Sequence, residues 1–64
     1  MTATTIKDTL GPLAIVLARK AGWTRSRWYT AVSREQALTP EERNAFRAVL
    51  SDHIDTARAL RKRL

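Results

Sequence analysis

The stretch Leu17-Ala18-Arg19-Lys20-Ala21-Gly22-Trp23-Thr24 carries the strongest structural signal in the chain. Glycine most easily adopts the left-handed conformation that follows a helix, so Gly22 is expected to end one. Thr24 then suits the N-cap of the next helix. Ala18, four residues before the glycine, is small enough for the two helices to cross closely. The stretch therefore predicts two helices joined by a tight turn, one over residues 12–21 and one over residues 24–33.

Upstream of this pair, the sequence predicts a brief first helix. Its residues are Ile6-Lys7-Asp8-Thr9-Leu10, with Thr4 or Thr5 as the N-cap, and Gly11-Pro12 stops it. Proline lacks an N–H group, so Pro12 suits the first position of the following helix. We expect residues 1–4 to be polar and frayed.

Downstream, Thr39-Pro40-Glu41-Glu42 marks a helix start. Threonine stands at the N-cap, proline at N1 and glutamate at N3, which together form a capping box. No glycine or proline follows Pro40, and the last basic residues, Arg61, Lys62 and Arg63, suit a helix C-terminus. A long helix over about residues 40–62 is expected. The whole chain, residues 1–64, is thus predicted to be one all-α domain of four helices.

Composition favours an anionic partner. The 64 residues include 12 Lys and Arg against 6 Asp and Glu, a formal net charge of +6, and the isoelectric point is about 11.2. A positive balance this large for the size raises the expectation of nucleic acid or a membrane surface as the partner. A soluble protein that happens to be basic is the alternative.

Several function classes find no support in the sequence. There is no cysteine, His53 is the sole histidine, and no glycine-rich phosphate loop is present, so we expect no enzyme activity, no cofactor, no metal and no small-molecule substrate. The longest apolar run, residues 13–18, is far shorter than the roughly 18 residues of a membrane span. The N-terminus also lacks the layout of a secretory signal. We therefore expect a cytoplasmic protein with no membrane partner.

The spacing across residues 12–33 matches a helix-turn-helix. The positions that such a motif buries hold small or apolar residues: Leu17, Ala18, Ala21, Trp23, Trp28 and Ala31. Stacking of a tryptophan on an unpaired base is a minority alternative to core packing. The outward face of the second helix is expected to read base edges in double-stranded DNA. Its residues are Thr24, Arg25, Ser26, Arg27, Tyr29, Thr30 and Ser33.

Individual residues on this surface also have simpler interpretations. Arg25 is a stronger candidate than Arg27 for a contact with guanine, and a solvated arginine pair is the alternative. Tyr29 could instead be half-buried in the core. Arg19 and Lys20, on the exposed side of the first helix, suit the DNA backbone, and plain solvation is an equal alternative.

The segment from Thr5 to Ser33 resembles the helix-turn-helix of phage Cro-type and related small repressors. The resemblance rests on the opening Ile6-Lys7-Asp8-Thr9-Leu10-Gly11 and on the core from Leu17 to Trp23. It implies a dimer on a nearly palindromic operator, with Arg25, Ser26, Tyr29 and Thr30 in the major groove, and a repressor or switch in a bacterial cytoplasm, associated with the nucleoid. Where the family commonly has polar residues at the start of the second helix, this chain has Ala14 and Ile15.

The last helix carries a heptad stripe. Phe46, Leu50, His53, Ala57, Leu60 and Leu64 recur at alternating intervals of four and three residues, which is the pattern of a helix–helix seam. The stripe is predicted to form a homodimer interface. The alternative is that it packs on the first three helices. His53 is expected to be a packed, hydrogen-bonded residue rather than a ligand.

These observations predict a sequence-specific DNA-binding regulator that occludes a promoter as a dimer. One alternative is a small helical interaction module, an inhibitor or adaptor, supported by the broad apolar face of the last helix. The other is nucleic-acid binding by charge alone, without sequence preference.

Overall fold

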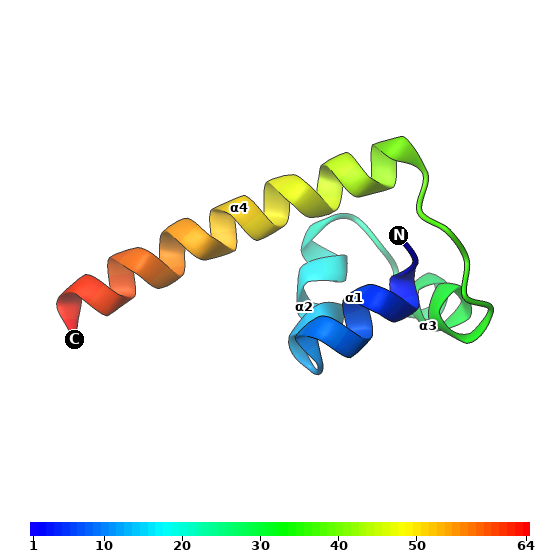
Figure 1. Cartoon of the computed structure of the whole chain (residues 1–64), viewed down its shortest axis with the longest axis horizontal. Helices are drawn as coiled ribbons and strands as arrows, with labels where there is room; N and C mark the ends of the chain where they lie inside the picture. The colour runs from blue at the N-terminus through cyan, green and yellow to red at the C-terminus, as the bar shows by residue number, and fades with distance from the viewer.

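Four helices account for most of the chain in a computed structural model that describes residues 1–64. They are α1 (Ala3–Leu10), α2 (Leu13–Lys20), α3 (Arg25–Ser33) and α4 (Pro40–Arg63). The three short helices form a cluster against which only the beginning of α4 lies, and the rest of α4 extends away from it (Figure 1). The predicted all-α class with a long C-terminal helix is confirmed.

The turn between α2 and α3 has the predicted geometry. Gly22 has a φ of +97°. The Trp23 N–H donates to the Ala18 carbonyl at 3.0 Å and the Gly22 N–H to the Arg19 carbonyl at 3.1 Å, which is the Schellman pattern that satisfies the last carbonyls of a helix. The side chain of Thr24 caps α3 by accepting from the Arg27 N–H at 3.1 Å. A residue with a Cβ would be strained at Gly22, so this glycine fixes where α2 ends.

The core joins the turn to α4 through three aromatic rings. Trp23 and Trp28 pack edge to face with ring centroids 5.6 Å apart, and Phe46 of α4 lies 5.8 Å from each of them. No polar side chain is buried. The buried residues are Ala3, Ile6, Ala14, Leu17, Ala18, Trp23, Trp28, Ala31, Leu38 and Phe46.

The N-terminus differs from the sequence prediction. The first helix begins at Ala3, and its N-cap is Thr2, whose hydroxyl accepts from the Thr5 N–H. Ala3 is fully buried. Thr2 also forms an isolated antiparallel bridge with Ala37, and the Met1 carbonyl accepts from the Leu38 N–H at 3.0 Å. The expectation of a frayed start and of a cap at Thr4 or Thr5 was wrong, because contacts with a segment far along the chain order these residues.

The connection from α3 to α4 is also more ordered than its polar sequence indicates. Glu35 adopts a positive φ of 51°, and its neighbour Gln36 donates to the Ala31 carbonyl at 3.0 Å. A left-handed glutamate thus ends α3 much as Gly22 ends α2, and the side chain of Glu35 is exposed. Leu38, in the same connection, is 8% exposed and belongs to the core.

Helix α4 has two halves in different environments. In the proximal half, residues 40–53, Phe46 is buried and Val49 and Leu50 pack on the core. In the distal half, residues 54–64, every residue is exposed. The placing of Phe46 in a dimer seam was therefore wrong: at 2% exposure it has no surface left to offer a partner.

Candidate nucleic-acid interface

One face of α3 is left uncovered by the rest of the chain. Trp28 and Ala31 point into the core, which turns the opposite side of the helix to solvent. The exposed side chains include most of those predicted to read bases, namely Thr24, Arg25, Ser26, Tyr29, Thr30 and Ser33. Tyr29 is 52% exposed and does not belong to the hydrophobic core, so about half of its surface is open to a partner.

Arg25 and Tyr29 form a pair on this face. They stand four residues apart, so they are neighbours on the helix surface. The guanidinium carbon of Arg25 lies 5.7 Å from the centroid of the Tyr29 ring, within the range of a cation–π contact. The stacking holds the arginine near the N-terminal end of α3, where its donors stay free.

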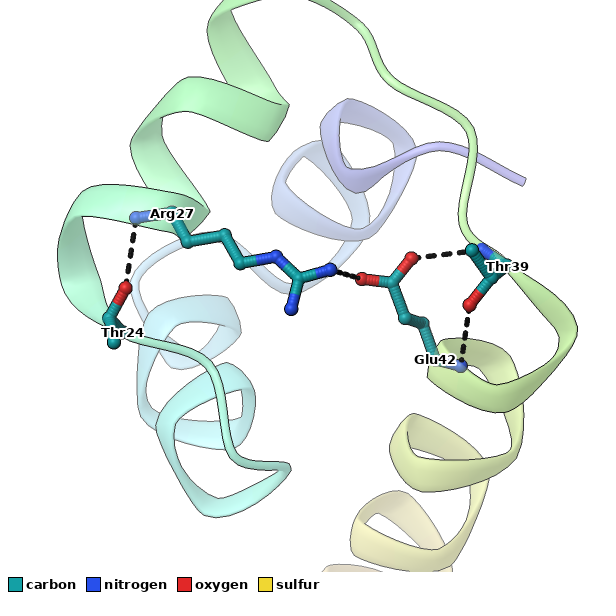
Figure 2. A network of polar contacts seen from close by, with 4 residues as sticks. All are labelled: Thr24, Arg27, Thr39 and Glu42. Carbon is teal, nitrogen blue, oxygen red and sulfur yellow. Dashed lines mark hydrogen bonds and ion pairs between the residues drawn. The ribbon is translucent and has the colours of Figure 1, made fainter.

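Arg27 does not share this face. Its guanidinium carbon lies 4.5 Å from the centroid of the Trp23 ring, and it forms an ion pair with Glu42. Figure 2 shows Glu42 between Arg27 and Thr39: it accepts from the Thr39 N–H at 2.9 Å, while its own N–H donates to the Thr39 hydroxyl at 3.1 Å. Arg27, predicted to read bases, is instead drawn into the contact between α3 and α4.

No local sequence pattern indicates the ion pair between Arg27 and Glu42, because the two residues are 15 positions apart. The sequence predicts only the role of Glu42 in the capping box. The box itself is confirmed. Its N3 carboxylate also accepts from Arg27 and thereby anchors the start of α4 to the start of α3.

The start of α2 offers little to a phosphate group. Ala14 is 1% exposed, and its N–H donates to the Gly11 carbonyl at 3.1 Å. Pro12 has no N–H. Pro12 and Ala14 therefore have no backbone N–H free to donate to an anion. The N-terminus of α2 is expected to contribute less to phosphate binding than a helix N-terminus ordinarily does.

The opening of α2 nevertheless adjoins the exposed face of α3. A depression between α1, α2 and α3 is lined by Lys7, Asp8, Gly11, Pro12, Ala14, Ile15, Trp28 and Tyr29. Lys7 and Ile15 were not predicted to contact DNA, yet they line the same hollow as Tyr29. At the other end of α2, Arg19 and Lys20 are exposed, as a backbone contact or plain solvation would both require.

Charge is distributed unevenly along the chain. Residues 9–34, which include α2 and α3, contain Arg19, Lys20, Arg25, Arg27 and Arg34 but no aspartate or glutamate. Only Arg27 among these forms an ion pair. The exposed face of α3 therefore belongs to a segment whose charged side chains are all basic and, apart from Arg27, form no ion pair. Such a segment attracts a polyanion.

Comparison with models of protein families, with curated proteins and with solved structures gave no match. The likeness to Cro-type repressors therefore rests on the residues quoted for it alone. None of the four helices combines the length and the apolar character that crossing a bilayer requires.

Proposed function

We propose that this protein binds double-stranded DNA in a sequence-specific manner, with α3 in the major groove. One observation carries the proposal: the uncovered face of α3 holds hydrogen-bonding side chains and a free arginine, and no carboxylate interrupts it. An α-helix fits the major groove, where each base pair presents a distinct pattern of donors and acceptors. A helix that is polar and cationic on its exposed face is suited to that groove.

The residues on this face have separate roles in the proposal. Arg25 donates two hydrogen bonds to the O6 and N7 atoms of a guanine, the commonest specific contact in the major groove. Tyr29 contacts a thymine methyl group or a phosphate. The hydroxyl groups of Ser26, Thr30 and Ser33 bond to base edges or phosphates, while Arg19 and Lys20 contact the DNA backbone and orient the protein.

The biological role that follows is transcriptional regulation in a bacterial cytoplasm. A protein of this size, held on a promoter as a homodimer, would occlude the polymerase without any catalytic activity. The resemblance of residues 5–33 to Cro-type repressors supports this role, whereas the proposal of DNA binding rests on the exposed face of α3.

A second function is favoured by a different surface. The distal half of α4 exposes Ile54, Leu60 and Leu64, which suits an interaction module that binds another protein through a helix. Binding to nucleic acid by charge alone is the third candidate. DNA-binding measurements separate all three.

The test selects bound duplexes from a random pool and then compares the selected duplex with a scrambled one by fluorescence anisotropy. Sequence-specific binding predicts at least about 10³-fold tighter binding of the selected duplex at physiological salt. Equal affinities indicate charge-only binding. Absence of binding even at low salt indicates a protein partner.

Two matched variants identify the reading face. Arg25→Ala and Arg58→Ala remove the same charge, from α3 and from distal α4 respectively. Arg25→Ala is expected to cost about 1–3 kcal/mol of discrimination at one base position, whereas Arg58→Ala leaves the sequence preference intact. Lys20→Ala should weaken binding to all sequences alike. If the two arginine variants have the same effect, α3 is not the reading helix.

A further inference from the structure

A groove with an apolar floor lies between the start of the chain and the proximal half of α4 (Figure 1). No Cα atom of α1 lies within 8 Å of one of α4, so only side chains meet across this gap. The volume of the groove is about 480 Å³, within the roughly 300–1,000 Å³ of small-molecule sites. The lining residues are Met1, Ile6, Leu38, Arg43, Phe46, Arg47, Leu50, Ser51 and Ile54.

The α4 side of the groove consists of two parallel rows of side chains. Residues four apart on a helix lie one above the other on the same face. The apolar row is Phe46, Leu50 and Ile54. The polar row beside it is Arg43, Arg47 and Ser51. The groove therefore has a cationic edge along its apolar floor.

The two arginines of this edge have no carboxylate partner. The only ion pair of the chain joins Arg27 to Glu42, and no aspartate or glutamate lines the groove. Two like charges four residues apart on a helix repel each other. An anion placed between Arg43 and Arg47 would relieve this repulsion and accept charge-assisted hydrogen bonds from both guanidinium groups.

A second apolar hollow adjoins the groove. Its volume is about 150 Å³, and it shares Met1, Ile6 and Leu50 with the groove. No charged residue lines it. Met1 is 67% exposed, and the unbranched side chain of methionine adapts easily to what it contacts. An apolar group bound in the groove thus finds further apolar surface beyond it.

We propose that the groove binds a small organic anion with an apolar body, the chemistry shared by fatty acids and aromatic carboxylates. The apolar body lies against Phe46, Leu50 and Met1, and the anionic group accepts hydrogen bonds from Arg43 and Arg47. A protein partner fits less well, because nine residues line the groove whereas a standard protein interface takes about 20–30 residues from each side. No sequence pattern indicates the site, because it joins residues 1–6 to residues 38–54.

The probe for this site is anilinonaphthalene sulfonate, a fluorescent dye with an apolar body and one sulfonate group. Fluorescence titration of the whole chain should give saturable binding of one dye per chain. Phenylnaphthylamine has the same rings without the sulfonate and should bind roughly tenfold more weakly, because it forms no charge-assisted hydrogen bonds. The sulfonate dye also binds molten globules, so near-ultraviolet circular dichroism verifies the packing of each sample. Equal affinity for the two dyes, or no saturable binding, overturns the proposal.

Two double variants of α4 locate the anionic group. Arg43→Ala with Arg47→Ala removes the cationic edge and is expected to weaken binding of the sulfonate dye roughly tenfold. Arg58→Ala with Arg61→Ala removes the same charge from the distal half and should leave the affinity unchanged. Neither pair should affect the neutral dye. If both pairs weaken the sulfonate dye equally, the attraction is general and the proposal is overturned.

A bulky side chain tests the place of the apolar body. Ser51→Phe fills the groove and is expected to weaken the binding of both dyes, because the space for their rings is occupied. Ala48→Phe adds the same ring to α4 at an exposed position outside the groove, so it should leave both affinities unchanged. Binding that Ser51→Phe does not affect contradicts the proposed site.

Competition with the dye distinguishes the two sources of the anion. Dodecanoate, below its micelle concentration, and naphthoate carry one carboxylate on an aliphatic and an aromatic body. Displacement by dodecanoate alone supports a fatty acid, displacement by naphthoate alone supports an aromatic acid, and displacement by both supports their shared chemistry. Displacement by neither overturns the proposal. So does a dye affinity that falls as the protein concentration rises, since a second copy of the chain then covers the groove.

The outcome is independent of the proposed function, because no residue of α3 lines the groove. A chain that binds the dye as described and binds no DNA would retain this site and refute the function of α3. A chain that binds one DNA sequence tightly and no dye would do the reverse.

Discussion

The proximal and distal halves of α4 belong to one continuous helix and carry one apolar stripe, but they differ in what covers that stripe. In residues 40–53 the stripe lies against α2 and the aromatic core, and Phe46 is 2% exposed. In residues 54–64 the stripe continues in the same register into solvent, where Leu60 is 57% exposed. A heptad spacing therefore identifies which face of a helix is apolar and leaves open whether the same chain or another covers it.

The two halves also differ in how they are held. The proximal end has a capping box, the ion pair from Arg27 and the three-ring contact of Trp23, Trp28 and Phe46. The distal half has only its own backbone hydrogen bonds and three basic residues in its last turn. Similar substitutions are therefore expected to lower the stability strongly in the proximal half and only slightly in the distal half.

The largest expected effect is at Phe46. Truncating a buried phenylalanine to alanine costs about 3–5 kcal/mol, and the whole domain is stable by about 3–10 kcal/mol at the usual free energy per residue. Phe46→Ala should therefore lose a large part of its free energy of unfolding. Leu60→Ala, on the same stripe in the distal half, should change the unfolding free energy by less than about 0.5 kcal/mol.

Urea denaturation followed by circular dichroism measures both variants. The protein is kept at low micromolar concentration, so that any dimer contributes little to the apparent stability. Comparable losses of stability for Phe46→Ala and Leu60→Ala would show that the distal stripe is covered within the single chain, contrary to its exposure.

A smaller effect is expected at Glu42, which fixes the start of the proximal half. Glu42→Ala removes both the carboxylate that caps the helix and the partner of Arg27, and a lost cap costs about 1 kcal/mol. Glu42→Gln keeps an acceptor for the Thr39 N–H, so it should lose less. Glu41→Ala is the control, because Glu41 is exposed and outside the network. The same denaturation experiment gives all three values.

Equal stabilities of Glu42→Ala and Glu41→Ala would mean that the network of Figure 2 contributes no more than the general attraction of a carboxylate to a helix N-terminus. An unchanged Glu42→Gln beside a destabilised Glu42→Ala would assign the effect to the cap rather than to the ion pair.

Features decided by neighbouring residues could be predicted from the sequence. Gly22 needs only its own freedom at positive φ to end α2, and Thr39, Pro40 and Glu42 form their capping box within one turn. The caps of α3 and α4 and the limits of these helices agreed closely for this reason. The exposed face of α3 followed from the same periodicity, since placing Trp28 and Ala31 inside turns Ser26, Tyr29 and Thr30 outside.

Features decided by distant residues were missed. Residues 1–3 are ordered by hydrogen bonds to residues 36–38, and no local pattern indicates that meeting. Arg27 turns away from the predicted reading face because Glu42 and Trp23 provide a carboxylate and a ring within its reach. Phe46 was assigned to a seam between copies because spacing alone does not reveal the two tryptophans that surround it.

We propose that α3, and not the more exposed and more basic distal half of α4, contacts DNA bases. Titration of ¹⁵N-labelled protein with a selected duplex, followed by NMR, tests it residue by residue. The account predicts the largest amide shift changes at Arg25, Ser26, Tyr29, Thr30 and Ser33, with residues 54–64 nearly unaffected. Changes confined to residues 58–63, with α3 unperturbed, would contradict it.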